Sequence, residues 1–117
     1  MSKAVPALPN SSLWADYFRE KGLLVEENER GFISAIVHED TCLIENWFVK
    51  EEFRKGVTAM RLVFKILKQA KEKKCKHFCG EIYKSDPLFQ YILNMHQKFG
   101  MQITEEDEFH VITSKNI

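Results

Sequence analysis

Hydrophobic and polar positions alternate along three early segments of the chain. Residues 23–37 form two extended runs joined by the polar turn "NERG", which is a hairpin signal. Residues 41–49, "TCLIENWFV", form a third run that is rich in β-formers and follows the turn "HED". The pattern therefore predicts three consecutive strands joined by tight turns.

The period then changes to that of a helix. From Gly56 to Lys74 apolar residues recur at helical spacing, while lysines occupy much of the other face. That lysine face is interpreted as solvated surface, with anion binding as the alternative. Residues 85–100 predict a second helix, with Asp86 as its N-cap, Pro87 at its first position and Gly100 past its end. A shorter helix is predicted over residues 11–22.

The remaining extended segments complete the predicted fold. Residues 77–83, "HFCGEIY", form one strand, and residues 101–104 and 108–114 form a hairpin across "EEDE". The order is helix, three strands, helix, strand, helix, two strands. This order predicts an α/β (α+β) fold in which helices cover both faces of a mixed sheet. Residues 1–10 are expected to be a flexible segment, and residues 11–117 a single domain.

Composition narrows the classes of function. Lys plus Arg and Asp plus Glu are equal at 17 each, so the net charge is zero and a nucleic-acid partner is not expected. The sequence has no apolar run long enough to cross a membrane, and its start lacks the apolar core of a signal peptide. We therefore expect a cytoplasmic protein without membrane or nucleic-acid partners.

The three cysteines are too few for a disulfide framework. Cys42, Cys75 and Cys79 are expected to be free thiols in a reducing compartment. The run "CKHFC" places His77 between two of them, but it lacks the second ligand pair of a structural zinc site. No metal site is therefore expected.

The segment "VKEEFRKGVTAMRL", Val49 to Leu62, runs from the end of a strand through a basic turn into the long helix. The first N–H groups of a helix point outward without partners, and the helix dipole favours an anion there. Such a junction can hold a phosphate group, although Val57 stands where a second glycine would help.

The element order, this segment and a third pattern together resemble the GNAT superfamily of N-acetyltransferases. "VKEEFRKG" is similar to the family segment Val-x-Pro-Glu-Tyr-Arg-Gly, with matches at Val49, Glu52, Phe53 and Arg54. "HQKFGM" is similar to the family signature Tyr-x-Lys-x-Gly-Phe. The likeness covers residues 11–114, without the family's usual first strand and helix, and short bacteriophage members look particularly similar.

The resemblance implies that the turn binds the pyrophosphate of acetyl-CoA. The implied cofactor-binding residues are Phe48, Val49, Arg54, Lys55, Gly56, Val57, Thr58 and Ala59. Without a gap, Val57 takes the first glycine position and Leu62 the family's buried leucine position. Deleting one residue would rescue Gly56 but would bury Arg61, which costs more than one loop glycine. We adopt the ungapped register, in which the loop is degraded but recognisable.

The resemblance also implies acetyl transfer to an amine by a carboxylate base and a proton donor. Glu45, on the central strand, is the candidate base, and its alternative is a solvent-facing strand residue. His96, at the signature tyrosine position, is the candidate acid, and its alternative is a surface or capping histidine. The identity of the amine is not predicted.

A second function stays open beside the enzyme. Val57, His96 and the shortened start also fit a catalytically inert GNAT-fold module, plausibly a phage protein in host cytoplasm or virion. Such a module would act through a protein partner or through self-association. Fold alone does not decide between these two functions.

Overall fold

A six-stranded mixed sheet is the centre of the part of the chain that the computed structural model describes, residues 13–117. The strands are β1 (Leu24–Asn28), β2 (Gly31–His38), β3 (Thr41–Val49), β4 (His77–Tyr83), β5 (Gln102–Glu106) and β6 (His110–Asn116). They lie in the order β1-β2-β3-β4-β6-β5, and every neighbouring pair is antiparallel except β3 and β4. The predicted strand order along the chain is confirmed.

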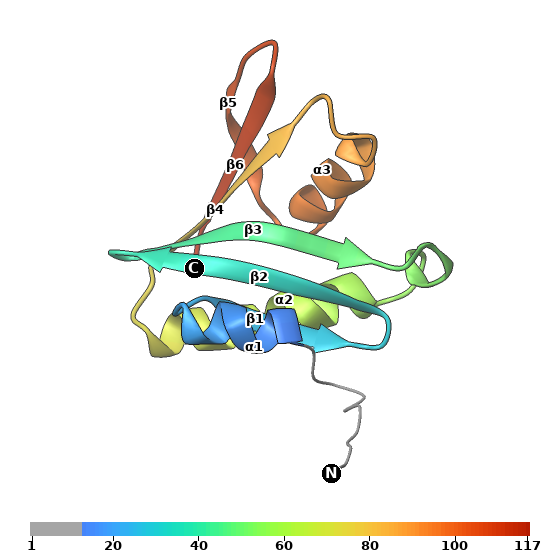
Figure 1. Cartoon of the computed structure of the whole chain (residues 1–117). Helices are drawn as coiled ribbons and strands as arrows, with labels where there is room; N and C mark the ends of the chain where they lie inside the picture. Colours follow the sequence, from blue (N-terminus) through green and yellow to red (C-terminus); the bar gives the residue numbers. More distant parts are fainter. Residues whose placement is uncertain (1–12) are drawn as a thin grey trace.

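Helices cover both faces of the sheet, as predicted. They are α1 (Leu13–Glu20), α2 (Thr58–Glu72) and α3 (Phe89–Lys98), with a short 3-10 turn at Glu51–Phe53. On one face, residues of α2 and α3 join the strands in the main core. On the other face, the Trp14 ring of α1 lies 4.6 Å from that of Phe32. Figure 1 shows α1 lying across β1. The predicted flexible segment 1–10, and Ser11 and Ser12 of the predicted first helix, lie outside the described residues.

The parallel pair β3 and β4 is joined over only part of its length. The pairing runs from Thr41 with His77 to Ile44 with Gly80 and then stops. Beyond it the two strands diverge, β3 toward Val49 and β4 toward Tyr83 (Figure 1). We call this divergence the fork. It separates a part built from β1, β2, β3, α1 and α2 from a part built from β4, β5, β6 and α3.

A bulge in β3 lies directly after the last residue of β3 that pairs with β4. Ser34 of β2 pairs with Asn46, but the next residue, Ala35, pairs with Ile44, so Glu45 is an extra residue. A bulge changes which face the following side chains point to. Trp47 and Val49 are consequently buried, whereas Glu45 and Asn46 are exposed.

Two predicted boundaries are wrong, and aspartate side chains explain both. The second long helix begins at Phe89 rather than Pro87, because the Asp86 carboxylate accepts the Leu88 N–H (2.8 Å) and closes a tight turn before the helix. The last hairpin turns two residues later than expected. Asp107 accepts two backbone N–H groups there, so Glu105 and Glu106 belong to β5.

The core supports the ungapped register of the basic turn. Leu62 is only 1% exposed and packs with Ile33 and Phe78 in the main core, whereas Arg61 points to solvent. An arginine in the position of Leu62 would lie buried without a partner. Among the described residues no helix is long and apolar enough to cross a membrane.

Candidate active site

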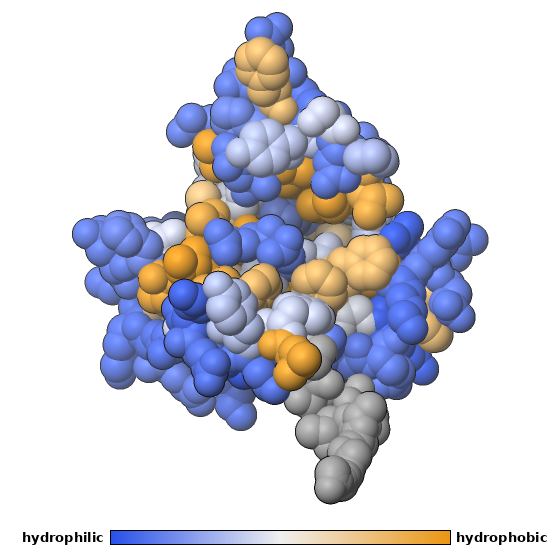
Figure 2. Space-filling model, viewed as in Figure 1, coloured by the Kyte–Doolittle hydropathy of each residue, from blue (hydrophilic) through white to orange (hydrophobic). Residues whose placement is uncertain are grey.

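The fork opens into a cavity of about 270 Å³ between the two parts of the molecule. Residues 44–48 of β3 and 81–83 of β4 line two of its walls, and Leu88, Ile92 and His96 line a third. Figure 2 shows hydrophobic and intermediate surface along the line between the two parts, while the periphery is mostly hydrophilic. The two predicted catalytic residues, Glu45 and His96, both line this cavity.

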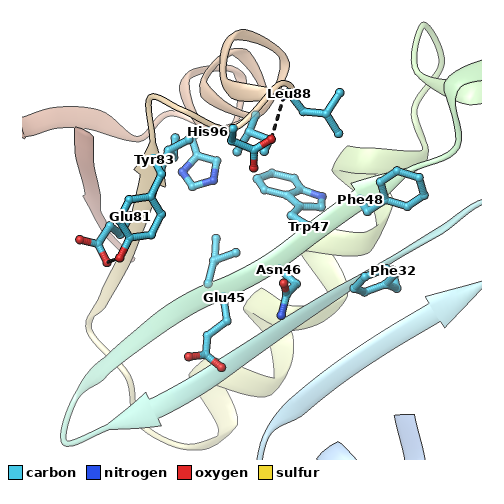
Figure 3. A pocket seen from close by; sticks show the side chains of 13 residues that line it. Phe32, Glu45, Asn46, Trp47, Phe48, Glu81, Tyr83, Leu88 and His96 are labelled. Atoms are coloured by element: carbon cyan, nitrogen blue, oxygen red, sulfur yellow. Dashed lines mark hydrogen bonds between the residues drawn. The ribbon is translucent and has the colours of Figure 1, made fainter. Parts of the chain in front are cut away.

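Glu45 reaches the cavity because it is the extra residue of the β3 bulge. It lies one position beyond the last residue of β3 that pairs with β4. The neighbouring Asn46 side chain donates to the Ser34 hydroxyl at 3.1 Å. Figure 3 shows Glu45 and Asn46 side by side on β3. The carboxylate is exposed to solvent at the mouth of the site, where it can take a proton from a bound amine.

His96 is a buried side chain, not a surface or capping one. It is 2% exposed, its Nδ1 lies 2.8 Å from the Thr113 hydroxyl, and its ring centroid lies 5.5 Å from that of Trp47, with the ring planes tilted by 39°. Burial lowers the pKa of His96 to about 4. The imidazole is therefore neutral at neutral pH, and the assignment of His96 as the proton donor stays a prediction.

Trp47 contributes an unsatisfied donor beside His96. The residue is 5% exposed, and its Nε1–H is buried without a hydrogen-bond partner among the described residues. A buried donor without an acceptor costs about 1–3 kcal/mol. Figure 3 places its indole between His96 and Phe48, along the cavity. A ligand that brings an acceptor to this point would remove that cost.

The predicted phosphate turn lies between β3 and α2, and the side chain of Val57 is exposed on it. Helix α2 begins at Thr58 without a side-chain cap, and Val57 occupies the N-cap position with φ −106° and ψ 4°. A close approach of a phosphate would need the Val57 side chain to turn inward, but this side chain is 55% exposed and stands beside the outward N–H groups of the first turn.

Arg54, which precedes the start of α2, is held against the aromatic rings of Phe48 and Tyr91. Its Nε donates to the Val49 carbonyl at 2.8 Å, and its guanidinium carbon lies 4.8 Å from the Tyr91 ring centroid. It lines a second cavity, of about 200 Å³, between α2 and α3. Other walls of this cavity come from Gly56, Ala59, Tyr91, Asn94 and Lys98. Of the remaining predicted cofactor-binding residues, Lys55 is exposed, Thr58 is buried and Phe48 lines the fork cavity.

Three residues at the fork were not predicted to belong to a site. Glu81 and Tyr83 line the cavity from β4, and the Tyr83 hydroxyl donates to Glu81 at 3.3 Å. His110 lies with its Nε2 3.6 Å from the other Glu81 oxygen and its Nδ1 3.2 Å from Asp107. A signal was available in the sequence, because alternation along "HFCGEIY" puts Glu81 and Tyr83 on one face of the predicted strand.

The cysteines lie away from this chemistry. Cys42, Cys75 and Cys79 are free thiols, and burial raises the pKa of Cys42 to about 12. Within residues 13–117, no group of three or more His, Cys, Asp and Glu side chains is arranged to hold a metal ion.

The comparisons with known proteins rest on shape rather than sequence. No protein-family model matches the chain, and no curated protein matches its sequence significantly. Its structure is similar to that of PaiA N-acetyltransferase from Thermoplasma acidophilum in complex with coenzyme A (TM-score 0.72, 14% identity). That match covers 86% of this chain and 66% of the other.

Two further structures give the same result. A GNAT family acetyltransferase from Elizabethkingia anophelis with acetyl-CoA bound has a TM-score of 0.67 and 16% identity, over 91% of this chain and 84% of the other. A Bacillus subtilis acetyltransferase in complex with CoA has a TM-score of 0.66 and 18% identity, over 89% and 82%. The chain therefore has the GNAT fold. At these identities the GNAT fold is what the likeness establishes, and the chemistry must be argued from the site.

Proposed function

We propose that this protein is an N-acetyltransferase that transfers the acetyl group of acetyl-CoA to an amine. The observation that carries the proposal is the fork, where pairing stops after Ile44 and Gly80 and a cavity opens beside Glu45 and His96. Structures of the same fold that contain CoA or acetyl-CoA support it.

The fork suits the thioester arm of acetyl-CoA. From Glu45 to Val49, β3 has no strand partner on the side of β4, so its backbone groups are available to an extended ligand with amide groups. The orphaned Nε1–H of Trp47 lies along the same cavity and offers a donor to a carbonyl oxygen. Both features fit an acyl group that enters between the strands.

The start of α2 suits the phosphates, with one obstacle. Its first-turn N–H groups have no side-chain cap, and Arg54 and Lys98 supply positive charge in the adjoining cavity. The exposed side chain of Val57 limits how closely a phosphate can approach these N–H groups. The residues at the start of α2 therefore fit the phosphates of acetyl-CoA, and Val57 is expected to weaken their binding.

The cavity residues divide the chemistry between a base and a neutral donor. Acetyl-CoA supplies a thioester carbonyl carbon that accepts the amine nitrogen, and the thiol of CoA leaves. Glu45 takes a proton from the ammonium group, directly or through a water molecule. The Thr113 hydroxyl lies 2.8 Å from Nδ1 of His96 and 4.0 Å from the Met101 thioether, and we propose that it donates to the imidazole nitrogen, the better acceptor. His96 Nε2–H is then a neutral hydrogen-bond donor toward the reacting atoms.

Calorimetric titration with acetyl-CoA tests the cofactor part of the proposal. We expect binding by the wild type, tighter binding by Val57→Gly, and weaker binding by Arg54→Ala, which removes a charge beside the phosphates. Val57→Ala separates removal of the side chain from the extra freedom of glycine. If no variant binds while all are folded, the protein is an inert GNAT-fold module instead.

Turnover tests the assignment of the base. Glu45→Gln should lower kcat/KM by about 100-fold or more, the typical contribution of a positioned base, without weakening acetyl-CoA binding. Glu72→Gln, the same change of charge on the exposed end of α2, serves as the matched control. Equal loss in both variants would show that Glu45 acts only through net charge.

A further inference from the structure

The turn between β5 and β6 carries an exposed aromatic side chain beside a run of acidic residues. Phe109 is 67% exposed, and residues 105–108 read "EEDE". All of β5 is exposed, and its pairing with β6 continues as far as Glu106 and Val111. The hairpin therefore projects from the body of the molecule as a paired ribbon. Figure 2 shows hydrophobic surface near its tip among hydrophilic neighbours. We call residues 105–109 the acidic tip.

Hydrogen bonds fix the backbone of the acidic tip. Asp107 accepts two backbone N–H groups, including that of Phe109 at 2.7 Å. The Phe109 carbonyl in turn accepts the Lys84 N–H at 2.8 Å. An exposed aromatic ring on a fixed backbone loses little conformational freedom when it binds, so Phe109 is suited to anchor a contact.

Two of the acidic charges at the tip have no partner. Glu106 pairs with Lys84 at 2.7 Å, and Asp107 is engaged by the turn itself. Glu105 and Glu108 form no hydrogen bond or ion pair with the described part of the chain. Their carboxylates are available to a basic surface.

Helix α2 presents a surface of the opposite charge. It has four basic residues and one acidic residue, and Lys73 and Lys74 follow it directly. The Phe64 ring is 55% exposed on this helix, and its centroid lies 5.7 Å from that of Phe99. An open groove of about 470 Å³ lies here, which we call the basic groove, and its lining residues are Phe64, Leu67, Lys68, Lys71 and Glu72.

The acidic tip and the basic groove are complementary but lie far apart in one molecule. The groove has an apolar floor with two ammonium groups against one carboxylate, and neither lysine forms an ion pair within residues 13–117. The hairpin points away from the part of the molecule that contains α2 (Figure 1), so the tip does not reach the groove of its own chain. Opposite charges around an apolar centre are the usual arrangement of two surfaces that bind each other.

We propose that the acidic tip of one molecule docks in the basic groove of a second copy. In this contact the Phe109 ring covers Phe64 and Leu67, while the two unpaired carboxylates of the tip bind the two lysines of the groove. Each copy keeps one free tip or groove, so the contact repeats head to tail into a chain or a ring. A contact of this size is weak and depends on salt. Neither surface lines the fork cavity, so the inference does not depend on acetyl transfer.

Sedimentation velocity over a concentration series tests the contact. The wild type should pass from monomer to larger species as its concentration rises to about 1 mM, and less so at high salt. Phe109→Ala (the tip variant) and Lys68→Glu/Lys71→Glu (the groove variant) should each stay monomeric at the same concentrations. A wild type that is monomeric throughout would overturn the inference.

Two controls match these changes. Leu13→Ala removes another exposed apolar side chain, and Lys21→Glu/Lys76→Glu makes the same change of net charge at exposed positions outside the groove. Both controls should associate as the wild type does, and all variants should keep its melting temperature. Loss of association in the controls as well would show that the tip and groove are not the contact.

Mixing the two variants gives the sharpest test. The groove variant keeps an intact tip, and the tip variant keeps an intact groove, so one working contact remains between them. Their equimolar mixture should form dimers and nothing larger. If the mixture stays monomeric while the wild type associates, self-association uses other surfaces and the proposal is wrong.

Discussion

At the scale of the residue, the environment of His96 decides which chemistry it can perform. The same imidazole on a helix surface would be half protonated near its ordinary pKa, whereas here it is enclosed by Trp47, Gly80 and Thr113. Burial disfavours the cationic form and leaves a neutral imidazole. The protonation state thus follows from packing, since nothing in the residue type alone distinguishes the two forms.

This burial predicts a specific loss of stability in acid. Burial lowers the pKa of His96 from 6.5 to about 4. Between these two pH values the residue is protonated in the unfolded chain and neutral in the folded chain. The contribution of His96 to the free energy of unfolding is complete above pH 6.5. It declines as the pH falls toward 4, by about 3 kcal/mol in total. Urea unfolding across this range should show the decline.

His96→Gln, which does not titrate, should flatten that part of the profile. His77→Gln, which removes an exposed imidazole, should leave it in place. Identical pH profiles for the wild type and His96→Gln would show that His96 is not responsible.

At the scale of the element, β4 and α3 approach each other through a glycine. A Cβ at Gly80 would clash with Cε1 of His96 and would stand 3.3 Å from the Thr113 hydroxyl oxygen. The absence of a side chain lets the helix place its imidazole over the strand at the fork. Gly80 therefore matters for the close contact of two elements rather than for backbone freedom.

Gly80→Ala should consequently destabilise the fold by about 1–3 kcal/mol, the usual cost of overpacking a closed core. The methyl group must push His96 and α3 away from β4, so acetyl transfer should fall as well. Gly56→Ala is a matched control, because its nearest contact would be an ordinary 3.6 Å. Denaturant unfolding of both variants checks this, and equal stability of the two would contradict the packing argument.

The elements were more predictable than the contacts between them. Apolar periodicity fixed the type and order of every strand and of the two long helices, because a period of two or 3.6 survives in the sequence whatever packs against it. The start of α3 was not predictable from the same rules, since Asp86 satisfies a turn as well as a cap. The exposure of Val57 depends on which way a loop faces.

The site was predictable only where one strand carried it. Glu45 was proposed from its place on the central strand, but the bulge that makes it an extra residue beside the cavity comes from pairing with β2. Glu81 was not predicted to line the cavity, because its position there depends on where the pairing of β3 and β4 ends. His96 was proposed by resemblance, and its burial follows from contacts with β4 and β6, which are distant in the sequence.

At the scale of the whole molecule, the fork joins two parts that share few hydrogen-bonded positions. Only Thr41–Ile44 and His77–Gly80 pair across it, whereas β2 and β3 pair along most of their length. A ligand seated in the fork contacts both parts at once. It therefore stabilises the joined state over any state in which the parts have separated.

Acetyl-CoA should accordingly slow amide hydrogen exchange on both sides of the fork. We expect added protection at the free edges of β3 and β4 and in α3, and not only in the turn at residues 50–57. Mass spectrometry of exchanged peptides, with and without acetyl-CoA, checks this. Protection confined to the turn would mean that the ligand binds α2 without entering the fork.

The parallel seam between β3 and β4 also has a consequence for the order of folding. Strands β1 to β3 follow one another through tight turns, whereas Thr41 must meet His77, 36 positions further along the chain. Contacts between distant positions form late because a long loop must close first. The cavity at the fork is thus expected to form after the hairpins of β1 to β3. A chain emerging from synthesis, or one opened briefly by heat, keeps much of its secondary structure while it has no place for a substrate.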